Sequence, residues 1–198
     1  VTPPAVEKNW KQTFKLFRLD KNTKFITNGS LNKIVDEKDL DNYWEIDEYD
    51  LILVDEAHKY RNHRSQGFDY LQRICKTPRK AEGLIEGDKK KVILISATPL
   101  NNRPEDLYYQ VQLFQDIRTS TLEKVNNLQN FFAPLIREYK DIMNTTTPDM
   151  GKVRNIYKQI REKVIAEITV RRTRKDLKKY PKYLDDLSIL RALKISLE

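Results

Sequence analysis

Short runs of branched apolar residues alternate with amphipathic segments along the first half of the chain. The runs are KFIT at 24–27, LILV at 51–54 and VILI at 92–95. Each is too short for a helix and too uniformly apolar for a half-exposed strand, so we predict strands buried on both faces. Between them we expect helices at about 5–17, 31–35 and 65–75. Strands that alternate with helices predict an α/β fold built on a parallel sheet.

The pattern becomes purely helical after the third run. A loop is expected over 76–91, because this stretch holds one proline, two glycines and six basic side chains. Pro104 followed by two acids predicts a helix start, since proline fits the first turn and acids there meet the positive end of the helix dipole. Apolar residues at helical spacing predict further helices over 128–139 and 152–170, with a break at 145–151. An α/β portion is therefore followed by a helical portion.

Composition places the chain among soluble globular proteins, because 39% of its 198 residues are hydrophobic and 33% are charged. That length suits one domain or one lobe of a larger protein. No stretch is apolar over the length of a membrane span, and the N-terminus lacks the apolar core of a signal peptide. The lone cysteine, Cys75, cannot form an internal disulfide. We therefore expect a cytoplasmic protein without a membrane partner, associated with the nucleoid if it is bacterial.

The net charge of +8 is concentrated in one segment. Residues 1–150 carry 23 basic and 23 acidic side chains, whereas residues 151–182 carry 12 basic and 3 acidic ones. A dense basic patch indicates a polyanionic partner such as nucleic acid, because phosphate contacts reward clustered Lys and Arg. A solvated helix face explains the same charge equally well, so charge alone leaves both interpretations open.

Two carboxylates stand at the end of the LILV run, where Asp55 and Glu56 begin the sequence Asp-Glu-Ala-His. Ligands of open parallel sheets collect at the carboxyl ends of the strands. One carboxylate there suits a Mg²⁺ ion that carries nucleotide phosphates and keeps water in its coordination sphere. The neighbouring carboxylate can orient and deprotonate the water that attacks a γ-phosphate. The competing interpretation makes both residues ordinary surface acids at the start of a loop.

Small hydroxyl residues follow the VILI run, which ends in Ser96, Ala97 and Thr98 and a polar turn. Hydroxyls at the tip of a neighbouring strand can hydrogen-bond the acidic loop and respond to a bound phosphate. The same residues also suit an ordinary strand exit in which Thr98 or Asn102 caps the next helix. The combination with Asp-Glu-Ala-His is more specific than either motif alone.

These motifs resemble those of the Swi/Snf-like DNA translocases of helicase superfamily two. LILVDEAH is similar to their Walker B motif, and VILISATPLNNRPEDLY is similar to their third helicase motif. VTPPAVEKNWKQTFKLF, at residues 1–17, resembles the segment after the second strand of their first RecA-like lobe, and ITVRRTRKDL, at 168–177, resembles the end of that lobe. The resemblance covers about residues 1–182, in the family's motif order. It implies a partial RecA-like parallel sheet of the P-loop NTPase type with flanking helices, followed by a helical segment.

The resemblance also implies a role for each matched residue of the nucleotide site. Asp55 would be the magnesium-associated acid, with the metal bound through water, and Glu56 would be the catalytic base. His58 would link this site, which binds ATP and Mg²⁺, to a coupling motif. That motif would consist of Ser96, Ala97 and Thr98.

Contacts with nucleic acid are implied at the two ends of the matched region. Pro3 and Pro4 would lie where the family's loop contacts the DNA backbone. The basic tail would contribute Arg171, Arg172 and Arg174, which would touch DNA or pack against the second lobe. Pairing with nearby acids accounts equally well for any one of these arginines.

One part of the family's machinery has no match in this sequence: the phosphate-cradling loop G-x-x-x-x-G-K-[ST]. A second α/β lobe is missing as well. We therefore expect a piece of a larger enzyme that hydrolyses little ATP by itself. The expected organisation is a partial RecA-like ATPase lobe over 1–120, a helical extension over 121–182 that ends in the basic RRTR segment, and a linker or tail over 183–198.

For the intact protein, the resemblance implies an ATP-dependent helicase or DNA translocase that couples ATP hydrolysis to movement on double-stranded DNA. Its cofactors would be ATP and Mg²⁺. Its partners would be double-stranded DNA and a second RecA-like lobe of the same polypeptide. Two alternatives stay open: an RNA helicase of the DEAH type, and a non-catalytic nucleic-acid-binding module.

Overall fold

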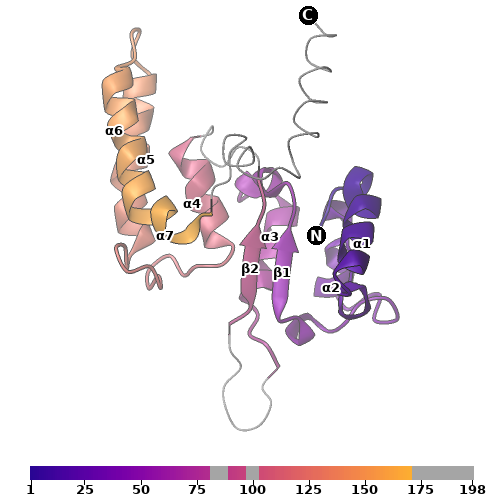
Figure 1. Cartoon of the computed structure of the whole chain (residues 1–198). Coiled ribbons are helices and arrows are strands. Elements are labelled where there is room, and N and C mark those ends of the chain that lie inside the picture. Colours follow the sequence, from indigo (N-terminus) through magenta and orange to yellow (C-terminus); the bar gives the residue numbers. More distant parts are fainter. Residues whose placement is uncertain (81–88, 97–102, 171–198) are drawn as a thin grey trace, which may run out of the picture.

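The computed structural model describes residues 1–80, 89–96 and 103–170. In this part of the chain an α/β portion around a small parallel sheet leads into a helical portion (Figure 1). No helix within the described ranges combines the length and the apolar character that a membrane crossing requires. The predicted order, with the α/β portion first and the helical portion second, is confirmed.

Among the described residues the sheet has two parallel strands, β1 (Leu51–Val54) and β2 (Lys91–Leu94). The ladder continues past the strand ends, where Ile95 N donates a hydrogen bond to Val54 O at 2.8 Å. Between the strands the chain forms helix α3 (Gln66–Lys76), a crossover of the kind that parallel pairing requires. Two of the predicted strands are therefore confirmed, together with their parallel direction.

The strand predicted at 24–27 does not form. Within the described residues its sheet pairing is one parallel bridge between Thr2 and Thr27, beside a hydrogen bond of 2.9 Å from Thr2 N to Ile26 O. Pro3 ends this pairing at once, because proline has no N–H to donate to a ladder. Ile26 of this apolar run is still buried in the core. The prediction of a strand here was wrong, and the prediction of burial was right.

Helices and single turns make up most of the remaining α/β portion. The helices are α1 (Glu7–Leu16), α2 (Asn32–Val35) and α3. Tight 3-10 turns occur at η1 (Pro4–Val6), η2 (Asp20–Asn22), η3 (Asn28–Ser30), η4 (Ile46–Glu48) and η5 (Ala57–Arg61). Ser65 caps α3, because its hydroxyl accepts a hydrogen bond from Phe68 N at 3.3 Å. The three predicted helices are confirmed, with ends that differ by one or two residues.

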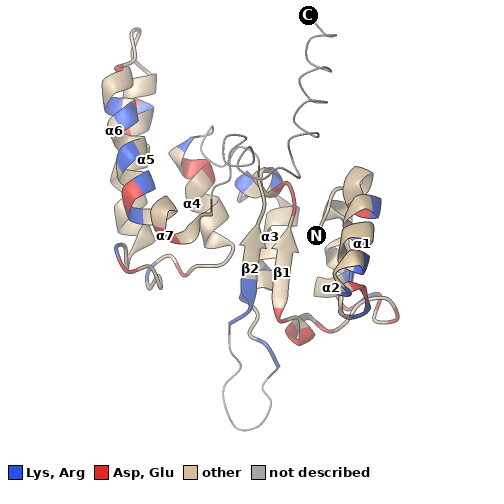
Figure 2. Ribbon diagram, in the orientation of Figure 1, with Lys and Arg blue, Asp and Glu red and all other residues tan. Residues whose placement is uncertain are grey.

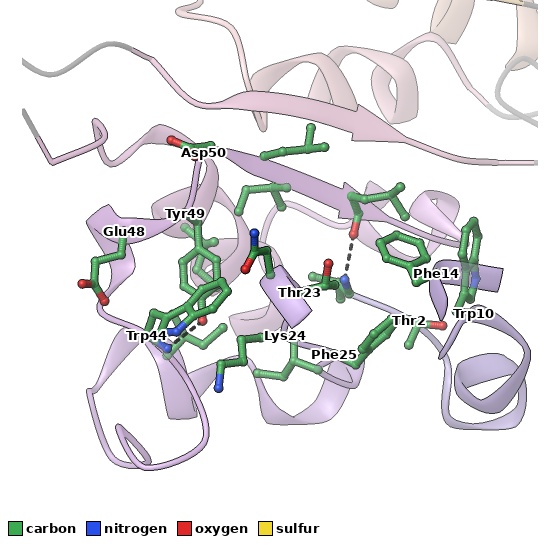
Figure 3. A pocket seen from close by; sticks show the side chains of 18 residues that line it. Thr2, Trp10, Phe14, Thr23, Lys24, Phe25, Trp44, Glu48, Tyr49 and Asp50 are labelled. Atoms are coloured by element: carbon green, nitrogen blue, oxygen red, sulfur yellow. Dashed lines mark hydrogen bonds between the residues drawn. The ribbon is translucent and has the colours of Figure 1, made fainter. Parts of the chain in front are cut away.

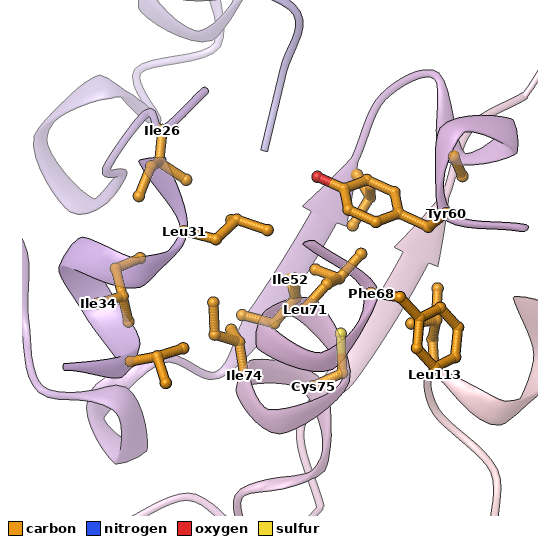
Figure 4. Close-up of a cluster of buried hydrophobic side chains, with 13 residues drawn as sticks. Ile26, Leu31, Ile34, Ile52, Tyr60, Phe68, Leu71, Ile74, Cys75 and Leu113 are labelled. Atoms are coloured by element: carbon orange, nitrogen blue, oxygen red, sulfur yellow. The ribbon is translucent and has the colours of Figure 1, made fainter. Parts of the chain in front are cut away.

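One face of the sheet packs against α3 in a core of aliphatic and aromatic side chains (Figure 4). Ile52 and Val54 of β1 are buried there together with Leu71 and Ile74 of α3. Cys75 lies in the same core, and its burial raises the pKa of its thiol to about 12. This core fixes the position of β1, and with it the position of the residues that follow the strand.

The other face of the sheet is open among the described residues. Leu51 and Ile93 are 48% and 46% exposed, although both belong to runs that we expected to be covered on both faces. Side chains alternate along a strand, so every second residue of β1 points away from α3. The prediction of burial on both faces is therefore wrong for the described part of the chain.

The helical portion contains a second core. Its elements are α4 (Pro104–Gln112), α5 (Leu128–Met143), α6 (Met150–Ile160), a π-helical turn η6 (Arg161–Ile165) and α7 (Ala166–Ile168). Helices α5 and α6 pack side by side and bury residues such as Phe132 and Ile156 (Figure 1). Instead of the single helix expected over 152–170, the chain forms α6, the π-helical turn and α7. The π-helical turn places two consecutive residues, Val164 and Ile165, in the core.

Helix α4 joins the two portions. Leu107 and Val111 of α4 belong to the core of the helical portion, and Leu113, directly after the helix, belongs to the core beneath the sheet. The buried side chain of Gln110 donates a hydrogen bond from Nε2 to Ala57 O at 3.3 Å. The backbone just beyond β1 is thereby attached to α4.

Candidate active site

A sharp backbone turn at the end of β1 presents the two predicted catalytic carboxylates, Asp55 and Glu56. Glu56 has φ 53° and ψ 45°, in the left-handed region that residues with a side chain rarely adopt. The turn is held by Ala57, which is buried and whose N–H donates to Ile95 O at 2.9 Å. Strained backbone of this kind persists only where the surroundings enforce it, and it is common at functional loops. The ends of β1 and β2 thus meet at the acidic turn.

Both carboxylate oxygens of Asp55 accept hydrogen bonds. Glu56 N donates to Asp55 Oδ1 at 2.8 Å, and the indole Nε1 of Trp10 donates to Asp55 Oδ2 at 2.7 Å. The backbone is held as well, because Asp55 N donates to Val1 O at 2.9 Å. The orientation of this carboxylate is therefore set by its own turn and by helix α1.

Glu56 and His58 lie side by side in the same turn. His58 Nδ1 is 3.0 Å from Glu56 Oε2, an ion-pair distance if the ring is protonated. The contact lacks the alignment of a hydrogen bond, and Nδ1 is buried without another partner among the described residues. The Glu56 side chain is 41% exposed, so it remains accessible to a substrate. His58 is therefore placed to restrain the carboxylate of Glu56.

The predicted coupling motif lies mostly outside the described residues. Ala97 and Thr98 fall there, whereas Ser96 is described. Ser96 directly follows Ile95, whose carbonyl accepts the hydrogen bond from Ala57 N. The start of the motif is thus next to the acidic turn, and its coupling role stays a prediction.

The predicted nucleic-acid contacts at the start of the chain differ in exposure. Pro3 is buried, and Pro4 is exposed at the first position of η1. Of this pair, Pro4 therefore has the side chain that a partner can reach. The predicted contacts of the basic tail lie outside the described residues; they are Arg171, Arg172 and Arg174.

A cavity of about 460 Å³ lies between residues 61–64 and the helices α4 and α5; we call it the basic cavity, although Glu105 and Asp106 also line it. Its cationic side chains come from three separate parts of the chain: Arg61, Arg64, Arg103 and Lys140. Lys140 forms an ion pair with Glu105. The three arginines form no ion pair with any residue in the described ranges, and all three are exposed. Figure 2 shows blue segments beyond the end of β1, whereas at the start of α4 a blue segment lies next to a red one.

Two aromatic rings add a flat surface to this basic cavity. The rings of His63 and Tyr109 stack with centroids 3.9 Å apart and planes inclined by 20°. Partial burial raises the pKa of Tyr109, mainly by desolvation, which keeps its hydroxyl protonated. Guanidinium groups beside such rings are suited to phosphates and to planar groups.

Comparison with known proteins identifies the family. Residues 6–192 match the family model described as the SNF2-related domain, which covers nearly the whole chain. The chain belongs to the SNF2-related family. It is a Swi/Snf-like member of helicase superfamily two, as its motifs predicted.

One curated relative of this SNF2-related chain is the "Uncharacterized ATP-dependent helicase YqhH" of Bacillus subtilis (strain 168). The two are 29% identical over 85 residues, which is 43% of this chain and 12% of the relative. This chain thus spans only a small part of that protein's length. No solved structure matches the chain. Its parallel sheet with helices is consistent with a partial RecA-like fold.

The acidic turn of the SNF2-related chain offers ligands that suit Mg²⁺. Asp55 and Glu56 place two carboxylates at the end of one strand. Within the described ranges, no three His, Cys, Asp or Glu side chains gather as a group of metal ligands. Mg²⁺ does not need such a group, because it is usually held by one or two carboxylates together with water and substrate phosphates. The residues present therefore fit a magnesium ion that arrives with a nucleotide.

Sequence reasoning missed two parts of this SNF2-related site. In the sequence Trp10 is recognisable only as part of a family-like segment, and its partner Asp55 is 45 positions away. The basic cavity was missed because its cations are spread from Arg61 to Lys140. No local spacing signals either arrangement, since both depend on how distant segments pack.

Proposed function

We propose that this chain is part of the first RecA-like lobe, of the P-loop NTPase type, of an ATP-dependent DNA translocase. The proposed lobe covers 1–120, and 121–182 forms its helical extension. The observation that carries the proposal is the acidic turn: Asp55 and Glu56 follow a parallel strand that is buried on one face, and Glu56 has a strained conformation, in a chain of the SNF2-related family. The ATP-dependent helicase named as a relative supports it.

In the proposed reaction, the acidic turn performs the chemistry of a Walker B motif. Mg²⁺, when bound, would supply positive charge that offsets the charge developing on the nucleotide phosphates. Asp55 would hold that ion through water, with its carboxylate oriented by two hydrogen bonds. Glu56 would accept a proton from the attacking water. His58 would keep the Glu56 carboxylate in place and link it to Ser96, Ala97 and Thr98.

Nucleic acid is proposed to bind through its phosphates, because a motor that moves along DNA must ignore base sequence. Pro4 is one proposed contact, with the arginines of the basic tail as further ones. The basic cavity supports a polyanionic ligand, because three of its cations, Arg61, Arg64 and Arg103, form no ion pair within the described residues. The proposed substrate is double-stranded DNA, and a second RecA-like lobe of the same polypeptide is the proposed partner that closes over it.

Replacing Glu56 by Gln in the full polypeptide tests the proposal. The substitution keeps the size of the side chain and removes the proton acceptor, so we expect loss of DNA-stimulated ATP hydrolysis while nucleotide binding persists. Glu37→Gln is the matched control, because Glu37 is also exposed and also has φ 53°, outside the proposed site. Retention of DNA-stimulated ATPase activity by Glu56→Gln would refute the catalytic role.

The same ATPase measurement separates the alternatives. Stimulation by RNA and not by duplex DNA would replace the DNA translocase with an RNA helicase of the DEAH type. A polypeptide that binds nucleic acid but hydrolyses no ATP, even as the unsubstituted protein, would be a non-catalytic binding module.

A further inference from the structure

We propose that Trp10 is a positioning residue that ties helix α1 to the magnesium-associated carboxylate of Asp55. The inference rests on the proposed function, because it assigns Trp10 a task in the site where Asp55 would hold Mg²⁺.

The bond between Trp10 and Asp55 is short and charge-assisted. Indole Nε1 lies 2.7 Å from Asp55 Oδ2, and because an indole N–H can only donate, the carboxylate oxygen is the acceptor. The other oxygen, Oδ1, accepts from Glu56 N at 2.8 Å. Two donors on two oxygens fix the plane of the carboxylate. Each oxygen keeps a further lone pair, which is enough to accept a hydrogen bond from metal-bound water.

The indole is itself held in place by aromatic packing. Its ring meets Phe14 edge to face with centroids 5.8 Å apart, and Phe14 meets Phe25 in the same way at 5.3 Å. These rings line one end of a cavity of about 530 Å³ beside β1, as Figure 3 shows. A ring supported in this way keeps its N–H aimed at Asp55, as partners of metal-ligating carboxylates do elsewhere.

Trp10 also connects Asp55 with the proposed nucleic-acid contact. Helix α1 begins at Glu7, directly after the turn η1 that starts with the exposed Pro4. A displacement of this turn by bound DNA would move α1, and Trp10 would carry the movement to the carboxylate. The Trp10–Asp55 bond therefore joins the helix that follows the proposed DNA contact to the proposed magnesium site.

Trp10→Phe removes the N–H and keeps an aromatic ring, so it tests the bond with little change in packing. Trp44→Phe is the matched control, because Trp44 lines the same cavity but packs against Tyr49 and Lys24. The first measurement is Mn²⁺ affinity of the full polypeptide in the presence of ADP, by electron paramagnetic resonance. The second is the Mg²⁺ concentration that gives half-maximal ATPase activity. Trp10→Phe is expected to lower the Mn²⁺ affinity and to raise the half-maximal Mg²⁺ concentration, each about tenfold, whereas Trp44→Phe should keep the wild-type values.

Further variants make the outcome decisive. Trp10→His keeps a ring N–H and is expected to lose less metal affinity than Trp10→Phe; equal losses would indicate packing alone and overturn the proposal. If Trp10→Phe keeps the wild-type Mn²⁺ affinity while Asp55→Ala loses it, the positioning role of Trp10 is also overturned. The proposed function then stays intact. Wild-type affinity in Asp55→Ala would instead remove the magnesium role of Asp55, and the proposed function would fail with it.

Discussion

Lys90 is a buried cation at the start of β2 whose titration can be measured. Its side chain is only 7% exposed, and its Nζ donates hydrogen bonds to Ile74 O at 2.9 Å and to Ile46 O. These bonds tie the turn η4 to the last turns of α3. Desolvation lowers the pKa of Lys90 from 10.5 to about 8, against the weaker opposing effects of Cys75 and Asp47. We predict that this shift makes stability depend on pH in a defined window.

The sign follows from comparing the folded and unfolded states. The folded pKa of about 8 lies below the unfolded value of 10.5, so between these two values the unfolded chain binds more protons than the folded chain. The free energy of unfolding therefore rises with pH in that window and falls as pH drops through 8. Between pH 8 and pH 9 the contribution of Lys90 grows by about 1 kcal/mol, since one pKa unit corresponds to about 1.4 kcal/mol.

Urea unfolding of the wild type and of Lys90→Met at pH 8 and pH 9 measures this contribution. The difference between the two unfolding free energies cancels the titration of other groups, including Cys75, whose pKa is raised to about 12. As the pH rises from 8 to 9, we expect the free energy of unfolding of the wild type to increase by about 1 kcal/mol relative to that of Lys90→Met. Lys89→Met, which changes the exposed neighbour, should leave the pH dependence intact. A difference that is the same at both pH values would refute the argument.

Two further predictions concern the basic cavity and the helical core. Arg61→Ala combined with Arg64→Ala should weaken DNA binding by the full polypeptide and lower the slope of log affinity against log salt by about 0.9 for each lost phosphate contact. Alanine at Lys33 and Lys38, which are ion-paired with acids, should change neither the DNA affinity nor the slope. An unchanged slope in the arginine variant would exclude the cavity as a phosphate site. Ile156→Ala should lower the free energy of unfolding by about 2–5 kcal/mol in urea titrations, because Ile156 is fully buried and leaves a void; a loss below 1 kcal/mol would contradict that packing.

The local hydrophobic pattern was sufficient to predict the elements whose conformation depends mainly on their own residues. The runs around β1 and β2 and the periodicity of α3 and α5 predicted those elements, because burial of one face imposes a spacing that is visible in the sequence. The strand at 24–27 failed for a non-local reason. A strand needs a partner ladder, and the segment that would pair with it is cut short by Pro3.

The candidate site also has features that the sequence predicted and features that it did not. Asp55 and Glu56 could be named from sequence, since a strand end followed by acids has a recognisable form. The left-handed conformation of Glu56 could not be predicted, because it is enforced by the burial of Ala57 and by the hydrogen bond from Ala57 N to Ile95 O. The contact between Glu56 and His58 was not foreseen either, although the two residues lie only two positions apart.

By itself, then, the sequence determined the order of β1, α3 and β2, the acids that follow β1 and the family to which the chain belongs. Only the tertiary structure decided which groups surround that turn. Trp10 reaches Asp55, and separated arginines share one cavity with Lys140. The physical reason is that hydrophobic periodicity encodes which face of an element is buried but not which distant element covers it. Hydrogen bonds and charge clusters between segments depend on that second choice.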